Sequence, residues 1–324
     1  MSGERSTLAW RPLARHDAVA SADLLNAVEA VDRIGENYTA EDTLQELVDP
    51  YADLERGSLA AFDGDVMVGY VKVRFKPSAD VVHRVFLDGA VHPDYRRRGV
   101  GTALVDAGVA AAEVLHAAHH PAARLVVDVH KCEHVAGVAE LLRSRGFAPV
   151  RHFQRLERAL TGTTPDPAVP AGLRVEPWSE QVDEDFRVAR NEAYRDHWGA
   201  VPMPVDAWRN KVVNQTFRPG ASFLLREVAT GTPVAVLVTA HWEADAETTG
   251  IRDAHFVVLG TSPAHRRRGA AGALLAHALR AAAEQGHHRA SLTVDSAAPS
   301  GASGVFARAG FAPAARYVRW ALER

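Results

Sequence analysis

The sequence predicts an α/β protein built from two copies of one domain, and three observations support this. The chain has 324 residues, about twice the usual domain size of roughly 150. Hydrophobic residues make up 47% of it, which is enough for two buried cores. A turn in which three arginines run into glycine occurs twice, in YRRRGVG (residues 95–101) and HRRRGAAG (residues 265–272). The chain therefore carries an internal repeat.

A proline-rich stretch separates the two copies. LTGTTPDPAVPAGL, residues 160–173, has no helical or strand period and is typical of a linker. We therefore expect an N-terminal domain over residues 1–160, a linker over residues 161–172 and a C-terminal domain over residues 173–324.

The same order of elements is expected on both sides of the linker. Each copy opens with a short strand, LAWRPL or LRVEPW, and continues with a hairpin around DGD (63–65) or TGT (230–232). An apolar strand, the arginine–glycine turn and a helix rich in alanine and leucine follow. Each copy then has another strand, ARLVVDV or RASLTVD, and a short helix that ends in Gly-Phe.

Charge and cysteine content exclude several classes of protein. With 37 basic and 40 acidic residues the formal charge is −3, so we expect no general attraction to nucleic acid or to an anionic membrane. We find no stretch that looks like a signal peptide or a membrane span. The single cysteine, Cys132, excludes an internal disulfide. We expect a cytoplasmic monomer or homodimer.

The repeated turn is suited to bind a phosphate. A strand-to-helix turn exposes unpaired backbone N–H groups, and Gly99 and Gly101 let an anion approach them closely. The helix dipole contributes about 0.3–1 kcal/mol, and charge-assisted hydrogen bonds must supply more. A basic loop that only caps a helix is the alternative, which the repetition disfavours. Neither copy has the glycine spacing of a P-loop or of a dinucleotide site.

The residues around the turn resemble a known motif. VHPDYRRRGVGTALV and GTSPAHRRRGAAGALL are both similar to Gln/Arg-x-x-Gly-x-Gly/Ala, the acetyl-CoA-binding motif of the GNAT superfamily of N-acetyltransferases. AYRDHWG (193–199) and VDSAAPSGASGVFARAGF (294–311) further resemble second-domain segments of the tandem-GNAT group that includes mycothiol synthase.

This resemblance covers both halves and implies two tandem GNAT-like domains. Each would be an α/β (α+β) fold with a mixed sheet whose fourth and fifth strands splay, with acetyl-CoA between them and its pyrophosphate on the turn. The residues to which the resemblance assigns cofactor binding are Val91, Arg96, Arg97, Arg98, Gly99, Val100, Gly101, Leu259, Thr261, Arg266, Arg267, Arg268, Gly269, Ala270 and Ala271.

Both copies depart from the family at one position. Many GNATs have a tyrosine before the final Gly-Phe, to which protonation of the departing thiolate is attributed, but Leu142 and Phe306 stand there. The family's common asparagine corresponds to Ala298 in the second copy. Because a CoA thiol is acidic enough to leave unassisted or through water, acetyl transfer does not require this tyrosine.

Direct acetyl transfer needs a neutral acceptor amine. For an amine with a pKa near ~10.4, neutralisation at physiological pH costs roughly 4 kcal/mol, which a general base or a desolvated site must offset. We name two catalytic candidates: His255, in phase with Val257 and Leu259 on its strand, and Asp88 in VFLDGAV. The alternatives are an exposed histidine at a strand end and an edge-strand carboxylate.

The acceptor side has weaker candidates. His197 and Trp198 follow the predicted helix EDFRVARNEAYRDHWG; they would line an acceptor pocket, or the tryptophan would only pack at the helix end. HKCEH (130–134) offers no fourth ligand, so we expect no metal.

The sequence thus predicts an acetyl-CoA-dependent N-acetyltransferase that acts on a small-molecule primary amine by direct transfer in a ternary complex. One alternative is acetylation of a cysteinyl amine, as in mycothiol synthase. The other is a non-catalytic acetyl-CoA-binding protein, which the missing tyrosines favour. The segments DHWG and GTSP favour the second half as the catalytic one, whereas the Gly-x-Gly turn favours the first.

Overall fold

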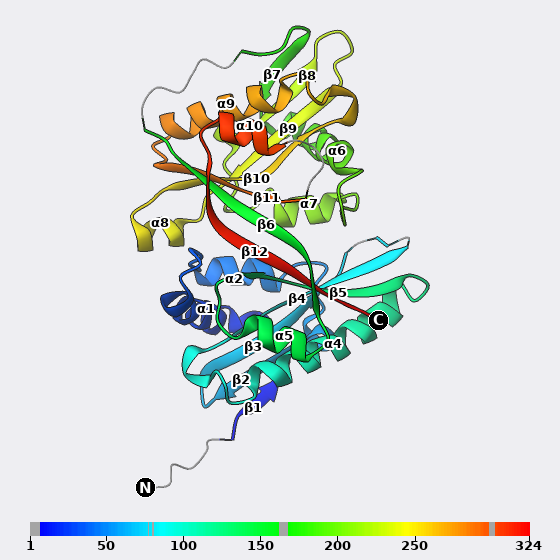
Figure 1. Ribbon diagram of the computed structural model, residues 1–324, viewed down its shortest axis with the longest axis vertical. Coiled ribbons are helices and arrows are strands. Elements are labelled where there is room, and N and C mark those ends of the chain that lie inside the picture. The colour runs from blue at the N-terminus through cyan, green and yellow to red at the C-terminus, as the bar shows by residue number, and fades with distance from the viewer. Residues whose placement is uncertain (1–6, 77, 80, 162–167, 298–301) are drawn as a thin grey trace. The chain divides into compact units, whose positions relative to one another are not determined.

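The computed structural model describes residues 7–76, 78–79, 81–161, 168–297 and 302–324 and divides into two compact units (Figure 1). Unit 1 comprises Met1–His152 with Tyr317–Arg324, and unit 2 comprises Phe153–Arg316. Residues 162–167 of the predicted linker, and Ala298, lie outside the described residues.

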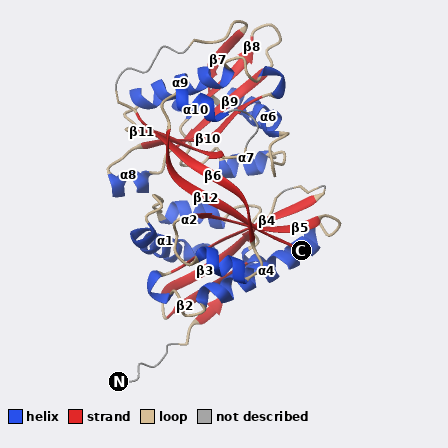
Figure 2. Ribbon diagram, in the orientation of Figure 1, coloured by secondary structure: helices blue, strands red, loops and turns tan. Residues whose placement is uncertain are grey.

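Unit 1 is a mixed sheet with helices on both faces (Figure 2). Its strand order is β1-β2-β3-β4-β5-β12; β4 and β5 are parallel, and the other neighbours are antiparallel. The elements that begin and end in it are β1 (Ala9–Arg11), α1 (Ala18–Asp32), α2 (Ala40–Leu47), α3 (Leu54–Gly57), β2 (Ser58–Asp63), β3 (Val66–Arg74), β4 (Val82–Val91), α4 (Val100–His119), β5 (Arg124–Cys132) and α5 (Val138–Ser144).

Unit 2 repeats this arrangement. Its strand order is β7-β8-β9-β10-β11-β6, again with one parallel pair, β10 with β11. Its elements are β7 (Leu173–Pro177), α6 (Asp183–Tyr194), α7 (Val205–Lys211), β8 (Phe223–Glu227), β9 (Pro233–Ala240), α8 (Glu243–Thr249), β10 (Asp253–Thr261), α9 (Ala270–Glu284), β11 (Arg289–Asp295) and α10 (Ala302–Arg308). The predicted hairpins, strands and helices are confirmed.

Two long strands, β6 (Ala148–Ala159) and β12 (Ala312–Glu323), each begin in one unit and end in the other. From Phe153 onward, β6 pairs with β11 of unit 2, and from Tyr317 onward, β12 pairs with β5 of unit 1. The compact units therefore differ from the chain-continuous stretches 1–160 and 173–324, because strand pairing, not chain order, decides to which sheet a strand belongs.

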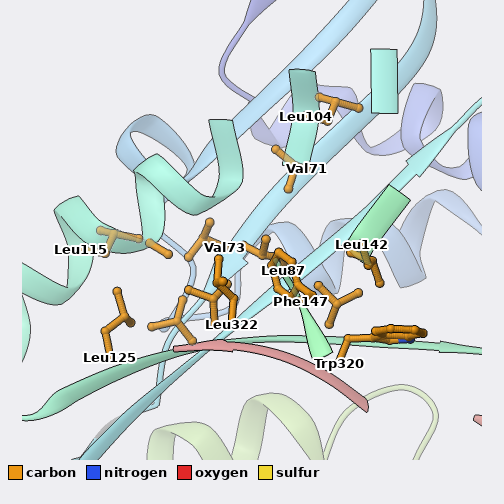
Figure 3. Packing of buried hydrophobic residues seen from close by; sticks show 14 of the residues in the cluster. Val71, Val73, Leu87, Leu104, Leu115, Leu125, Leu142, Phe147, Trp320 and Leu322 are labelled. Carbon is orange, nitrogen blue, oxygen red and sulfur yellow. The ribbon is translucent and has the colours of Figure 1, made fainter. Parts of the chain in front are cut away.

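The exchanged strands complete the cores. Trp320 and Leu322 of β12 lie in the same buried cluster as Val73, Leu87 and Leu142 of unit 1 (Figure 3). Leu156 of β6 is likewise part of the buried cluster of unit 2. Burying such side chains removes apolar surface from water, which contributes about 25 cal/mol per Å².

Helix α4 follows the turn of unit 1 and covers the sheet. Leu104, Ala112 and Leu115 on one of its faces are buried against the strands. A Cβ atom on Gly108 would come within 2.8 Å of Val71, so glycine allows the close approach. The helix is long and apolar enough to cross a membrane, but its buried face packs as in a core helix.

Replacing Trp320 by alanine tests the exchange. Trp320 is 4% exposed, so Trp320→Ala should lower the unfolding free energy of unit 1 by about 3–5 kcal/mol. Trp10→Ala on β1, where the side chain is 39% exposed, serves as the matched control and should cost less than about 2 kcal/mol. Urea unfolding followed by circular dichroism measures both, and equal losses would contradict the proposed burial.

Candidate functional site

The two arginine–glycine turns have the same backbone conformation. Arg97 and Arg267 both have φ of 61°, and Gly99 and Gly269 have φ of 89° and 86°. A non-glycine residue in this left-handed region costs roughly 1–3 kcal/mol and clusters at functional sites. The first helical hydrogen bonds also match, from the N–H of residue 103 to Gly99 O and from that of residue 273 to Gly269 O, both 3.0 Å. The amides that begin each helix therefore lack a partner within it.

The first arginine of each turn holds the turn in place. Arg96 donates to Val91 O and forms a bidentate pair with Asp32 at the end of α1, at 2.7 and 2.8 Å. Arg266 donates to Thr261 O and pairs in the same way with Asp196, at 2.6 and 2.7 Å. The hydrogen bonds of these guanidinium groups are therefore used within the protein itself. No motif or spacing points to the two aspartates, which lie 64 and 70 residues from their partners.

The other turn residues differ in what they can offer a ligand. The next two arginines and the glycine of each turn are exposed. Val100 and Ala270 are buried, so they can offer only their backbone. The candidates with exposed side chains or an exposed glycine are Arg97, Arg98, Gly99, Arg267, Arg268 and Gly269.

The strand before each turn leaves its parallel neighbour early. The β4–β5 pairing ends at Phe86↔Asp128, although β4 continues to Val91. The β10–β11 pairing ends at His255↔Ser291, although β10 continues to Thr261. The expected splay of the fourth and fifth strands is therefore present in both units, and each splay opens towards a turn.

Only β10 is interrupted where the splay begins. Its register with β9 shifts between Phe256 and Val258, whereas the β3–β4 register is continuous. A bulge adds one residue and re-aims side chains. Leu259 consequently packs in the cluster that contains Ala254 and Phe256, so the predicted phase relation between His255 and Leu259 is wrong.

His255 stands at the last paired position before the splay. Its Nδ1 lies 2.8 Å from Ser291 Oγ, and its ring is 5.7 Å from that of Trp242. Burial lowers the pKa of His255 to about 4, with further lowering by Arg155 and Arg289 that the Asp253 carboxylate opposes. The imidazole is therefore neutral at physiological pH and has a basic nitrogen available. The alternative of an exposed strand-end histidine does not describe this environment.

Unit 1 places different groups at the corresponding positions. Phe86 occupies the position of His255, and the guanidinium groups of Arg74 and Arg319 lie 5.3 and 5.0 Å from its ring centroid. Lys131 Nζ donates to Gly89 O at 2.8 Å, between two strands that no longer pair there.

Asp88 lies beside these groups on β4. Its side chain is 43% exposed and 3.8 Å from Arg74. Burial opposes ionisation of this carboxyl, but Arg74, Lys72 and Lys131 outweigh that effect and lower its pKa. Asp88 is thus an ionised, charge-paired carboxylate on β4, which lies between β3 and β5, at a position beyond the last pair that β4 shares with β5.

The remaining candidates lie near the turn of unit 2. His197 is exposed; its Nδ1 is 3.2 Å from Trp198 O and its ring 5.4 Å from that of Tyr194. His197 and Trp198 directly follow Asp196, the aspartate that pairs with Arg266. Tyr194 donates to Leu259 O at 3.3 Å. The buried Oγ1 of Thr261 has no hydrogen-bond partner in the described part of the chain.

The positions of the missing family tyrosine are core positions. Leu142 is buried in the cluster of unit 1 and Phe306 in that of unit 2. Neither side chain carries a proton donor, so these positions supply no acid.

Comparisons with known proteins agree with this geometry. The sequence profile of the Acetyltransferase (GNAT) family matches the chain twice, at residues 27–147 and 182–311. A mycothiol acetyltransferase of Salinispora arenicola is 28% identical over 320 residues, which cover 94% of each chain.

Two solved structures share the fold. A GCN5-related N-acetyltransferase from Sphaerobacter thermophilus has a TM-score of 0.73 at 24% identity, over 98% of this chain and 95% of that one. A tandem GNAT protein from the clavulanic acid biosynthesis pathway has a TM-score of 0.71 at 19% identity, over 98% of each. The duplicated fold and its repeated turn define a tandem acyltransferase. The chain belongs to the GNAT acetyltransferase family.

The environment of His255 predicts an unusual titration. Its imidazole NMR signals, assigned with His255→Gln, should titrate near pH 4, well below the ordinary value of 6.5. Between these pH values the unfolded chain binds more protons than the fold does. The contribution of His255 to stability is therefore lost as the pH falls through this window.

Removing the cation Arg155 tests the cause of the low pKa of His255. Arg155→Gln should raise the midpoint, because Arg155 disfavours the imidazolium. Arg209→Gln, an exposed arginine on α7, is the control and should leave it unchanged. A wild-type midpoint at 6.5 or above would show that the imidazole is not desolvated.

Proposed function

We propose that this protein is an acetyl-CoA-dependent N-acetyltransferase of the cytoplasm that acetylates a small-molecule primary amine by direct transfer, and that unit 2 performs the reaction. The observation that carries the proposal is the position of His255, which stands where the strands separate, on the strand that leads into the arginine–glycine turn. Unit 1 has the same turn but Phe86 at that position.

The residues of the turn fit a diphosphate. Bare amides at the start of a helix, exposed arginines and an exposed glycine together favour an anion. Arg266 would hold the turn in place through its pair with Asp196. The exposed Arg267 and Arg268 would donate hydrogen bonds to the phosphates. The unpartnered Oγ1 of Thr261 supports a polar ligand beside the end of β10.

Unit 1 would bind the coenzyme less well and would not catalyse. In the splay of unit 1, the Lys131 ammonium already donates a hydrogen bond to the Gly89 carbonyl. The amide-containing arm of the coenzyme would have to displace this lysine to enter. In unit 2, Val294 stands three residues beyond Ser291 on β11, as Lys131 does beyond Asp128, and has no such donor.

The proposed chemistry is attack of a neutral amine on the thioester carbonyl carbon. The new C–N bond forms, the C–S bond breaks, and the coenzyme thiolate leaves. His255 Nε2 would accept the proton that the amine nitrogen loses. With a pKa of about 4, the imidazole is too weak a base to deprotonate a free alkylammonium, which lies about six pKa units higher. It acts instead as the C–N bond forms and the nitrogen becomes acidic.

The same environment selects the neutral amine. Burial and the cations Arg155 and Arg289, which disfavour an imidazolium at His255, also disfavour an ammonium beside it. His197 and Trp198, next to the Asp196 anchor, are the proposed wall of the acceptor pocket. A mycothiol-type cysteinyl amine is a second candidate acceptor, which the similarity to a mycothiol acetyltransferase along 94% of the chain supports.

A matched pair of glycine variants tests which unit works. Gly269→Asp forces an L residue into φ of 86° and puts a carboxylate at the turn of unit 2, whereas Gly99→Asp does the same at φ of 89° in unit 1. Gly269→Asp should lower thiol release from acetyl-CoA by about 100-fold or more, because it removes charge-assisted contacts. Gly99→Asp should change it by less than about threefold.

Calorimetric titration of acetyl-CoA gives the complementary readout for the glycine pair. Two sites are expected in the wild type, and the weaker one should be lost in Gly99→Asp. Loss of thiol release in Gly99→Asp alone would assign the reaction to unit 1 instead.

A kinetic pH profile tests the base. His255→Gln keeps a polar side chain without a basic nitrogen and should lower kcat by about 10²–10⁴-fold. In the wild type, kcat/KM should rise with pH along a limb that follows the pKa of the acceptor amine across an amine panel, including a cysteinyl-glucosaminyl-inositol amine. Acetyl-CoA binding without thiol release for any amine would point to a binding protein.

A further inference from the structure

A buried hydroxyl connects His255 to a carboxylate. Ser291 of β11 is 0% exposed; its Oγ lies 2.8 Å from His255 Nδ1 and 2.6 Å from Asp253 Oδ2. The three side chains form a continuous hydrogen-bonded chain from imidazole to carboxylate, in which Ser291 is 36 positions from His255 and 38 positions from Asp253.

The direction of these hydrogen bonds follows from the number of protons. A serine hydroxyl has one proton to donate. Ser291 donates it to the Asp253 carboxylate in a short, charge-assisted hydrogen bond. Ser291 Oγ must therefore accept from His255, so His255 Nδ1 carries the proton. In a neutral imidazole the other nitrogen, Nε2, is then the bare acceptor.

The carboxylate is itself fixed. Arg155 of the exchanged strand β6 donates to Asp253 Oδ2 at 2.9 Å, and Arg289 Nε lies 3.3 Å from Oδ1. Glu157 on β6 pairs with both arginines, each at 3.1 Å. Two arginines and two carboxylates thus lie together beside the imidazole and balance in charge.

The charged and titratable groups around the imidazole come from several elements. They are Arg155 and Glu157 on β6, Asp253 on β10 and Arg289 on β11, with His241, which follows β9 and whose Nδ1 donates to Asp253 O at 2.9 Å.

We propose that Ser291 and Asp253 are positioning residues that hold the His255 ring with Nδ1 protonated and Nε2 bare towards the acceptor amine. The inference rests on the proposed role of His255 as the base. The chain does not move a proton to Asp253; it selects the tautomer and orients the ring, so that the basic nitrogen faces the reacting atoms.

The duplicated unit shows that the fold alone does not require this chain. At the equivalent paired positions, unit 1 has Arg84, Phe86 and Asp128. Arg84 pairs directly with Asp128 at 3.0 Å, and the phenyl ring of Phe86 has no hydrogen-bonding group that could join such a chain. The histidine, serine and aspartate therefore occur together only in the unit to which we assign the reaction.

The tautomer can be measured without any activity. Nitrogen-15 NMR of histidine-labelled wild-type protein, with His255 assigned by comparison with His255→Gln, should show protonated Nδ1 and bare Nε2 at pH 7. A protonated Nε2 in the wild type would overturn the inference, even if acetyl transfer takes place.

Variants of Ser291 test the consequence for catalysis. Ser291→Ala should shift the tautomer towards protonated Nε2 and lower kcat by about 10–100-fold, by analogy with loss of the hydrogen-bond partner of a metal-binding histidine. The KM for acetyl-CoA should stay within about twofold. Ser291→Thr, which keeps the hydroxyl, should restore both the tautomer and most of kcat. Thr248→Ala, at an exposed hydroxyl residue on α8, is the control and should match the wild type.

The outcomes separate the two proposals. Absence of thiol release from the wild type with every amine would refute the proposed function while leaving the tautomer measurable. An active wild type in which Ser291→Ala keeps the protonated Nδ1 and full kcat would refute the positioning role alone. Circular dichroism of each variant verifies that it is folded.

Discussion

The strands β4 and β10 part from their parallel neighbours before they end, and the candidate site depends on that separation. Parallel strands held together to their ends would leave no room for a ligand beside the turn. Here β5 and β11 are instead held on their other edges by β12 and β6, as far as Cys132 and Asp295. Beyond Phe86↔Asp128 and His255↔Ser291, the backbone groups on the facing edges of the two parallel strands have no strand partner. Unpaired buried backbone groups are costly. In unit 1, Lys131 satisfies one of them.

The turn that follows each splay is strained and braced. The left-handed residues Arg97 and Arg267 would relax in an unsupported loop. The bidentate pairs Arg96–Asp32 and Arg266–Asp196 tie each turn to the end of a neighbouring helix. This brace leaves the glycine and the other two arginines of each turn exposed to solvent. Division of labour among three adjacent arginines, one structural and two exposed, explains why they occur together.

Duplication kept this scaffold and changed the residues placed in it. The same paired positions carry an aromatic ring among cations in unit 1 and a histidine–serine–aspartate chain in unit 2. The bulge in β10, absent from β4, lies directly after His255. Since a bulge re-aims neighbouring groups, the two splays offer different surfaces even though their turns superimpose in conformation.

The sequence by itself determined the repeat, the hairpins, the apolar strands and the turn-to-helix transitions, because periodicity, turn residues and glycine act over a few neighbouring positions. It also brought His255 forward as a candidate. It did not reveal that β6 and β12 exchange sheets, that β10 is bulged, that Asp32 and Asp196 hold the turns, or that Ser291 links His255 to Asp253. Each of these depends on which distant segments lie side by side. Only the tertiary structure decided them, because strand partners and side-chain contacts are chosen by the packing of the whole unit.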